Sequence, residues 1–270
     1  MRTLNNLKKN SLVMMAIALL LVAANINSNL IKPKIVLSKQ DETWNLNDEM
    51  IQRFNLGFKR LESSFLWIST ILESDIEHYQ KKDSNSWMFL RFNTISKLEP
   101  KFYENYSFGG PYLSIVKDDL VGASIIYDKG LKQFPDDFRL LKDAGFHYYF
   151  EVGDYERAFE LYSKLVRYKE VNPTIVANLA RLETSRGNLS SAYDLLSDQL
   201  QSIEDQDSSL AIKIKKHLYA IKAEIDLNCL NQHKEMCSKK DYYLDDYLKK
   251  DGLYYAAHEW IPFRMKQRNK

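Results

Sequence analysis

The chain has few cysteines, prolines and glycines. Its 270 residues include two cysteines, six prolines and nine glycines. So few turn-forming residues argue against long disorder and against an all-β fold, which needs a turn after every short strand. Apolar residues make up 45% of the chain and charged residues 27%, which is ordinary for a globular protein. The sequence therefore predicts one sizeable core or two small ones.

The chain also lacks a charge excess and the common catalytic motifs. Its 38 basic and 36 acidic residues leave a formal net charge of +2, which is too balanced to indicate nucleic-acid binding. It contains no glycine-rich phosphate loop, no nucleophile elbow and no His-Glu-x-x-His motif. We therefore predict a non-catalytic protein without a metal, a cofactor, a small-molecule substrate or a nucleic-acid partner.

An internal repeat is present in the middle of the chain. Gly187 follows Gly153 by 34 residues, and Ala192 follows Ala158 by the same distance. Ala123 precedes Ala158 by 35 residues, which indicates a third copy. Apolar residues between these anchors coincide at the same offset: Leu141 with Ile175, Phe159 with Tyr193, Leu161 with Leu195, Tyr162 with Leu196, and Val166 with Leu200.

With these anchors, residues 85–206 resemble the tetratricopeptide repeat family, whose units are helix–turn–helix pairs about 34 residues long. The resemblance implies an all-α solenoid in which each pair buries its apolar face against its neighbours. Pro100 and Pro135 would end second helices, and Gly153 and Gly187 would form tight turns. The alternative is a generic helical bundle.

Other segments flank the repeats. Residues 28–50 are predicted to be a polar linker, 207–228 a capping helix, and 229–270 an irregular tail. Within residues 51–84, apolar side chains recur three or four apart from Met50 to Tyr79, which predicts a helix. Its apolar stripe consists of Ile51, Phe54, Phe58, Leu61, Phe65, Ile68 and Ile71.

The amino terminus has the order of a secretory signal. Residues 1–10 are basic, and residues 11–27 are mainly apolar and carry no charge. We predict a retained anchor, and the repeat resemblance suggests a bacterium. The protein would then cross the cytoplasmic membrane once, with its carboxyl-terminal part in the periplasm. Cleavage near Ala24 would instead give a soluble periplasmic or secreted protein. A cytoplasmic scaffold is a third alternative.

The family resemblance also implies a partner-binding groove. His147 and Arg181 are offset by 34 residues on the first helices of adjacent repeats. In the repeat family, residues around these positions line the groove that holds a partner's peptide segment. The resemblance therefore implies that His147, Glu151, Arg181 and Ser185 line a groove. The alternative is that they are exposed polar residues without a partner.

Both cysteines lie late in the chain. On an unbroken helix, Cys229, His233 and Cys237 would share one side and could bind a metal, with His258 as a fourth ligand. Such a helix separates the two cysteine α-carbons by about 12 Å, whereas a disulfide tolerates less than about 7 Å. Since the predicted compartment is oxidising, we predict a disulfide in a loop. Unpaired thiols are the third possibility.

An acidic stretch follows in the same tail. Asp241, Asp245 and Asp246 are close in sequence but lack the glycine and the ligand spacing of a calcium loop. We predict a solvated acidic turn.

Together these features predict a protein–protein interaction scaffold or assembly factor of the bacterial cell envelope. The alternative is a metal-dependent or enzyme-accessory envelope protein that uses the tail with Cys229, His233 and Cys237.

Overall fold

A computed structural model describes most of the chain, which divides into two compact units, residues 1–44 and 45–270. The described residues are 14, 15, 17, 19, 20, 22, 38–43, 57–232, 234 and 236–265. In the first unit, the described part of the predicted 11–27 segment is helical, and the short helix α2 (Lys39–Glu42) is capped by Ser38. Among the described residues, no helix combines the length and apolar character needed to cross a membrane.

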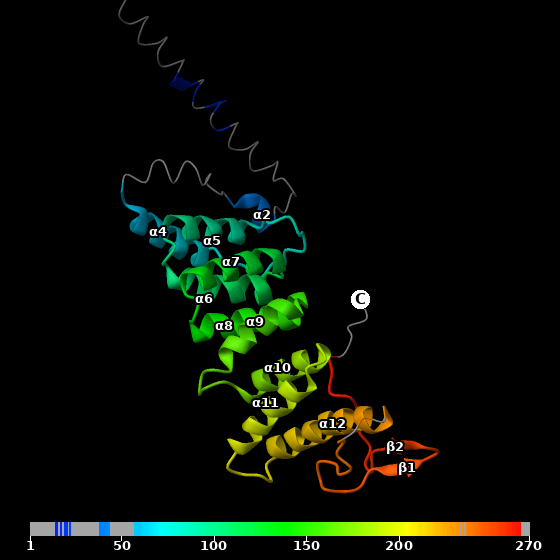
Figure 1. Ribbon diagram of the computed structural model, residues 1–270. Helices are drawn as coiled ribbons and strands as arrows, with labels where there is room; N and C mark the ends of the chain where they lie inside the picture. The colour runs from blue at the N-terminus through cyan, green and yellow to red at the C-terminus, as the bar shows by residue number, and fades with distance from the viewer. Residues whose placement is uncertain are drawn as a thin grey trace, which may run out of the picture. The chain divides into compact units, whose positions relative to one another are not determined.

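The second unit consists mainly of helices (Figure 1). They are α4 (Lys59–Leu72), α5 (Trp87–Leu98), α6 (Tyr103–Pro111), α7 (Leu120–Gln133), α8 (Phe138–Phe146), α9 (Tyr155–Leu165), α10 (Pro173–Ser185), α11 (Leu189–Gln201) and α12 (Ser209–Asn231). Two π-helical turns, η1 (Tyr112–Val116) and η2 (His147–Val152), continue α6 and α8.

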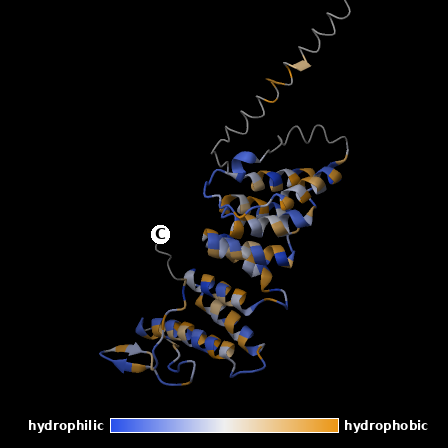
Figure 2. Cartoon of the chain, turned by 180° about the vertical axis from the view of Figure 1, so that it is seen from behind, coloured by the Kyte–Doolittle hydropathy of each residue, from blue (hydrophilic) through white to orange (hydrophobic). Residues whose placement is uncertain are grey.

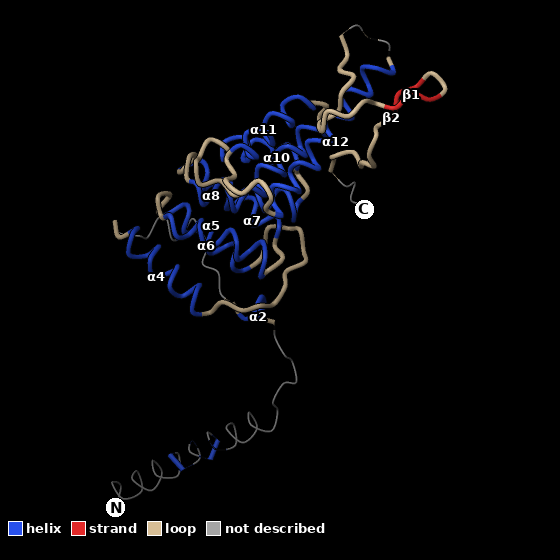
Figure 3. Tube along the Cα trace, turned by 90° about the horizontal axis from the view of Figure 1, so that it is seen from below, coloured by secondary structure: helices blue, strands red, loops and turns tan. Residues whose placement is uncertain are grey.

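The predicted mainly helical fold is therefore confirmed. The tail differs from the prediction of an irregular segment in one respect. Its strands β1 (Leu248–Lys250) and β2 (Leu253–Tyr255) form an antiparallel hairpin, drawn in red in Figure 3.

Neighbouring helices pair in chain order. Helix α6 packs against α7, α8 against α9, and α10 against α11, and α12 lies on α11. The first helices of these pairs begin 35 residues apart, at Tyr103, Phe138 and Pro173. Figure 2 shows hydrophobic and hydrophilic residues interleaved along the helices, as expected for amphipathic helices that bury one face.

Small residues at the helix contacts and glycines at the turns explain this pairing. Ala123, Ala158 and Ala192 lie in the second helices and are fully buried, so the paired helices can approach closely. Gly153 and Gly187 have φ angles of 77° and 87°, in the left-handed region that glycine adopts without steric cost. The repeat anchors in the sequence therefore lie at the contacts between helices and at the turns.

The core has two clusters. The larger one is rich in aromatic residues and extends from α5 to α10. A smaller cluster joins α10, α11 and α12 with Phe263 of the tail. The tail is therefore part of the packed structure at the α10–α12 end of the unit.

The helix predicted for Met50–Tyr79 is shorter in the structure. Of this range, residues 50–56 lie outside the described residues, and α4 ends at Leu72. Its apolar stripe does not face the core, since Leu61, Phe65 and Ile68 are exposed. Leu66 and Trp67 on another side of α4 pack against the core instead.

Candidate partner-binding groove

One helix position can be compared in α6, α8 and α10, the first helices of the three pairs, and in α12. The ninth residues of α6, α8, α10 and α12 are Pro111, Phe146, Arg181 and His217. Four residues further along the first three helices lie Ile115, Phe150 and Ser185. Phe150, Arg181 and His217 line one open depression of about 550 Å³. We give the name groove to this set of seven residues, and the depression covers its part on η2, α10 and α12.

The groove has an apolar half and a polar half. On α8 and the π-helical turns η1 and η2, the exposed fractions are 44% for Phe146, 65% for Ile115 and 36% for Phe150. On α10 and α12, the equivalent residues are Arg181, Ser185 and His217. The depression joins the two halves, because its lining includes Phe150 from the first half and Arg181 from the second.

The chain's own tail lies against the polar half and contacts it through backbone groups and side chains. The Thr184 hydroxyl donates a hydrogen bond to the Phe263 carbonyl. The backbone N–H of Met265 donates to Ser185 Oγ at 3.2 Å, and the Tyr149 hydroxyl donates to the Met265 sulfur at 3.0 Å. These contacts hold residues 263–265 along α10.

Phe263 is the buried side chain of this segment. Its ring lies 4.3 Å from the His217 ring, measured between centroids, and the Arg181 guanidinium lies 4.9 Å from its centroid. Arg181 is itself oriented by a hydrogen bond of 3.2 Å to the side-chain oxygen of Asn178. An aromatic ring between a guanidinium and an imidazole gains dispersion and cation–π attraction.

Charge also favours this arrangement. Burial, together with the positive charges of Arg181 and Lys213, lowers the pKa of His217 to about 4. His217 is therefore neutral at pH 7 and adds no positive charge to those of Arg181 and Lys213. Arg264 forms an ion pair with the buried Glu224 of α12, which holds the next residue of the segment.

The predicted groove residues have different surroundings in the structure. Arg181 and Ser185 contact the tail segment directly. Glu151 is half-buried in η2. The residues that the sequence prediction missed are Thr184, His217 and Phe263. The sequence analysis did not predict this segment. The aromatic and basic residues around Pro262 are the signal in the sequence that could have indicated it.

His147 is a core residue, so its prediction as a groove residue requires correction. It has an exposed fraction of 0%, and its two ring nitrogens lie 2.7 Å from Ser114 Oγ and 2.8 Å from Ser124 Oγ. Burial lowers its pKa to about 4. The 34-residue offset fails here because the first helices repeat every 35 residues, which makes Phe146 the counterpart of Arg181.

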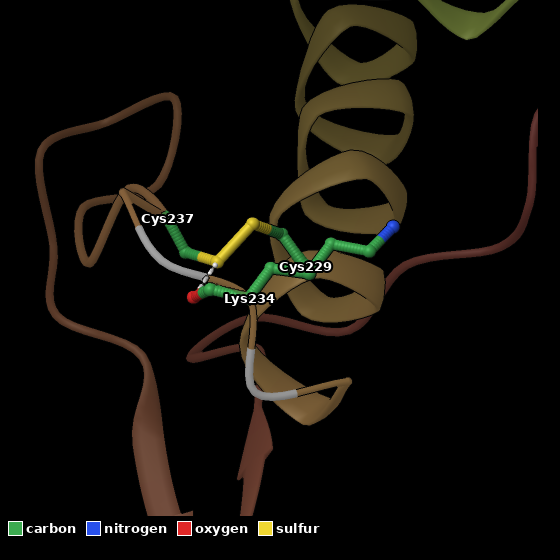
Figure 4. Close-up of a disulfide and its surroundings, with 3 residues drawn as sticks. All are labelled: Cys229, Lys234 and Cys237. Atoms are coloured by element: carbon green, nitrogen blue, oxygen red, sulfur yellow. Dashed lines mark hydrogen bonds between the residues drawn. A yellow bond between two sulfur atoms is a disulfide. The ribbon is translucent and has the colours of Figure 1, made fainter.

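The two cysteines are joined by a disulfide (Figure 4). Cys229 lies in the last turn of α12, which ends at Asn231, and Cys237 lies beyond the helix. Their α-carbons are 5.7 Å apart, so the two residues cannot share one face of an unbroken helix. His233 lies outside the described residues. Because both sulfurs are bonded, neither is a thiolate ligand for a metal.

The acidic stretch is only partly solvated. Asp245 and Asp246 are exposed, but Asp241 has an exposed fraction of 1%. The prediction of a solvated turn is therefore wrong for Asp241, which caps the turn by accepting hydrogen bonds from the backbone N–H groups of Tyr243 and Asp245.

A scan against models of known protein families finds no match for this chain, and no curated protein matches its sequence.

Proposed function

We propose that the protein is a non-catalytic interaction protein of the tetratricopeptide-repeat type. Its groove would bind an extended segment of a partner protein. The repeated helix pairs, the buried alanines of the second helices and the turn glycines support this assignment. The equivalent helix positions of Pro111, Phe146, Arg181 and His217 on α6, α8, α10 and α12 support it further.

The seated tail is the observation that carries the proposal. In it, side chains of α10 bond to the backbone of Phe263 and Met265, and one aromatic ring is buried against His217, which supports binding of an extended segment. Recognition of a peptide by one aromatic anchor beside an arginine is a common arrangement at protein interfaces. We infer that the partner segment carries an aromatic residue for the site between Arg181 and His217. Apolar residues of the same segment would cover Phe146 and Phe150.

The proposed setting is the bacterial cell envelope. Residues 11–27 would anchor the chain in the cytoplasmic membrane and leave the repeats in the periplasm, where the protein acts as a scaffold or assembly factor. The Cys229–Cys237 disulfide suits such an oxidising compartment. Cleavage near Ala24 would leave the same groove on a soluble protein.

A peptide titration tests the groove without knowledge of the partner. The probe is a fluorescent peptide with the sequence of residues 257–270, added to the full chain carrying Phe263→Ala. Because this substitution removes the anchor that competes from within the chain, we expect binding at least about tenfold tighter than to the unchanged protein. Fluorescence anisotropy measures the difference.

Two arginine variants complete the experiment. In the Phe263→Ala background, Arg181→Ala should abolish peptide binding, because it removes the guanidinium that lies over the ring. Arg186→Ala is the matched control, since Arg186 lies over Phe159 and pairs with Glu156, away from the tail. Equal peptide binding by the Arg181 and Arg186 variants would contradict the proposed groove.

A further inference from the structure

A second cluster of polar side chains lies in the tail. Asp241 and Asp245 belong to one turn, and His258 follows the β1–β2 hairpin. One ligand atom from each of these three residues lies within 4.8 Å of the other two. The His258 Nε2 atom and the Asp245 Oδ2 atom are 3.0 Å apart. The fold thus brings an imidazole and two carboxylates together from two separate segments.

The buried carboxylate of Asp241 is incompletely bonded. Its Oδ1 atom accepts the backbone N–H groups of Tyr243 at 2.8 Å and Asp245 at 3.0 Å. Its Oδ2 atom is buried and has no hydrogen-bond partner among the described residues. A desolvated carboxylate oxygen without a donor is costly, so buried atoms of this kind call for an unseen partner. The turn accounts for one oxygen of Asp241 and leaves the other available.

Apart from His258, the two carboxylates of the cluster have no charge partner among the described residues. Among the described residues, neither Asp241 nor Asp245 forms an ion pair with a lysine or arginine. The neighbouring Lys240 lies 2.9 Å from Asp246 instead. Two carboxylates and one imidazole form a ligand set that one divalent transition-metal cation accepts.

His258 is held in place from α12. Its backbone N–H donates to the Tyr219 hydroxyl oxygen at 3.1 Å, and that hydroxyl donates to the His258 carbonyl at 3.3 Å. The ring of Tyr243 also lies at right angles to the imidazole, with centroids 5.8 Å apart. Residues behind a metal ligand that fix its orientation commonly raise metal affinity.

We propose that Asp241, Asp245 and His258 bind one divalent transition-metal ion of the zinc class. An imidazole ligand favours zinc and its neighbours over calcium and magnesium, which prefer oxygen alone. On binding, the proton shared by His258 Nε2 and Asp245 Oδ2 moves to Nδ1 or is released to solvent, the Nε2 lone pair coordinates the ion, and two metal bonds replace the contact between His258 and Asp245. Three protein ligands leave a further coordination position for water.

The site is independent of the groove but lies next to it in sequence. His258 precedes Ile261 by three residues, and residues 261–265 form the segment that lines the groove depression. A bound ion would tie the start of this segment to the 241–246 turn. The metal would thus fix the direction from which the tail enters the groove.

Calorimetric titration of the full chain with Zn²⁺, after removal of metals with a chelator, tests the proposal. We expect one ion per chain, and a loss of affinity of at least about tenfold in both His258→Ala and Asp245→Asn. Asp245 is exposed, so its variant remains informative if His258→Ala fails to fold. Asp246→Asn is the matched control, because Asp246 is an exposed acid of the same turn outside the trio, and it should bind as the unchanged protein does.

A further variant separates this site from the one that the sequence suggested. His233→Ala should leave zinc binding unchanged. No binding by the unchanged chain would overturn the proposal. Binding that is lost in His233→Ala and retained in His258→Ala and Asp245→Asn would overturn it as well.

Discussion

The two halves of the groove are built on equivalent helix positions but present opposite chemistry. On α8 and the turns η1 and η2, Phe146, Ile115 and Phe150 are apolar and exposed. On α10 and α12, Arg181, Ser185 and His217 are polar, and the tail contacts them. The difference shows that the repeat fixes where side chains lie, whereas the individual residues decide what each half binds.

The cores behind the two halves also differ, both in size and in the segments that supply their residues. Behind α8, Gly145 lies against Tyr162 so closely that an added β-carbon would approach the ring within 2.5 Å. Behind α10 and α12, a smaller cluster is completed by Phe263, which comes from the tail. We infer that the first half is a rigid surface and that the second can open when the tail leaves.

The largest expected effect tests this difference in rigidity. Tyr162→Ala should lower the free energy of unfolding by about 3–5 kcal/mol, because it leaves a cavity in the large core. Phe263→Ala should cost about 1–2 kcal/mol, because the tail can detach without unfolding the helices. Urea denaturation measures both values. Equal costs would show that the tail is as integral to the fold as the core behind α8.

The disulfide should have the next largest effect, confined to the covered half. The bridge closes a loop between residues eight apart in sequence, for which the chain-entropy estimate is about 2–3 kcal/mol. The double variant Cys229→Ser/Cys237→Ser should therefore unfold at a lower urea concentration. Hydrogen exchange of α6 and α8 amides should keep its rate under native conditions. Equal acceleration of exchange in all helices would refute this local role.

Two histidines, the buried His147 and the half-buried His217, allow the two halves to be compared by their response to pH. His147 and His217 both have a folded-state pKa of about 4, below the value of about 6.5 for an unfolded histidine. The unfolded chain therefore takes up protons first as pH falls. The stability that these groups contribute is complete above pH 6.5 and is lost between about pH 6.5 and pH 4.

Phe263→Ala should change the pKa of only one of the two histidines. Removal of the ring exposes His217 and should raise its pKa toward 6.5, while the pKa of His147 stays unchanged behind Ser114 and Ser124. Two-dimensional NMR of the imidazole protons between pH 4 and pH 8 measures both values. A shift at His147 equal to that at His217 would mean that the two environments are coupled.

The smallest expected effect concerns a single hydrogen bond of the covered half. Ser185→Ala removes the acceptor of the Met265 N–H and should weaken tail docking by about 0.5–1 kcal/mol, since the bond is exposed. The Met265 amide should then exchange its hydrogen slightly faster in Ser185→Ala than in the unchanged chain. Ser190→Ala on α11 is the control and should leave this exchange rate as it is.

The sequence alone predicted the parts of the fold that local signals control. Gly153 and Gly187 lie at left-handed turns, and Ala123, Ala158 and Ala192 lie at helix contacts. These positions are readable because glycine and alanine are selected there for backbone and steric reasons.

Other features depend on tertiary structure and could not be read in this way. The π-helical turn η2 accommodates one extra residue in the first helix, so the 34-residue offset selected His147 in place of Phe146. The tail segment at Phe263 lies 82 positions beyond Arg181 in the sequence, and no periodicity links the two. The apolar stripe of α4 predicted a helix but not the face that it buries.

Photo-crosslinking in living cells tests most directly whether the groove receives a partner segment. Phe150→p-benzoylphenylalanine places the crosslinker on an exposed phenylalanine between the two halves, and Tyr255, an exposed tyrosine of β2, is the control position. We predict one reproducible protein adduct at Phe150 that increases with Phe263→Ala and decreases with Arg181→Ala. The same adducts at Phe150 and Tyr255, or none at Phe150 in the folded protein, would contradict a partner-binding groove.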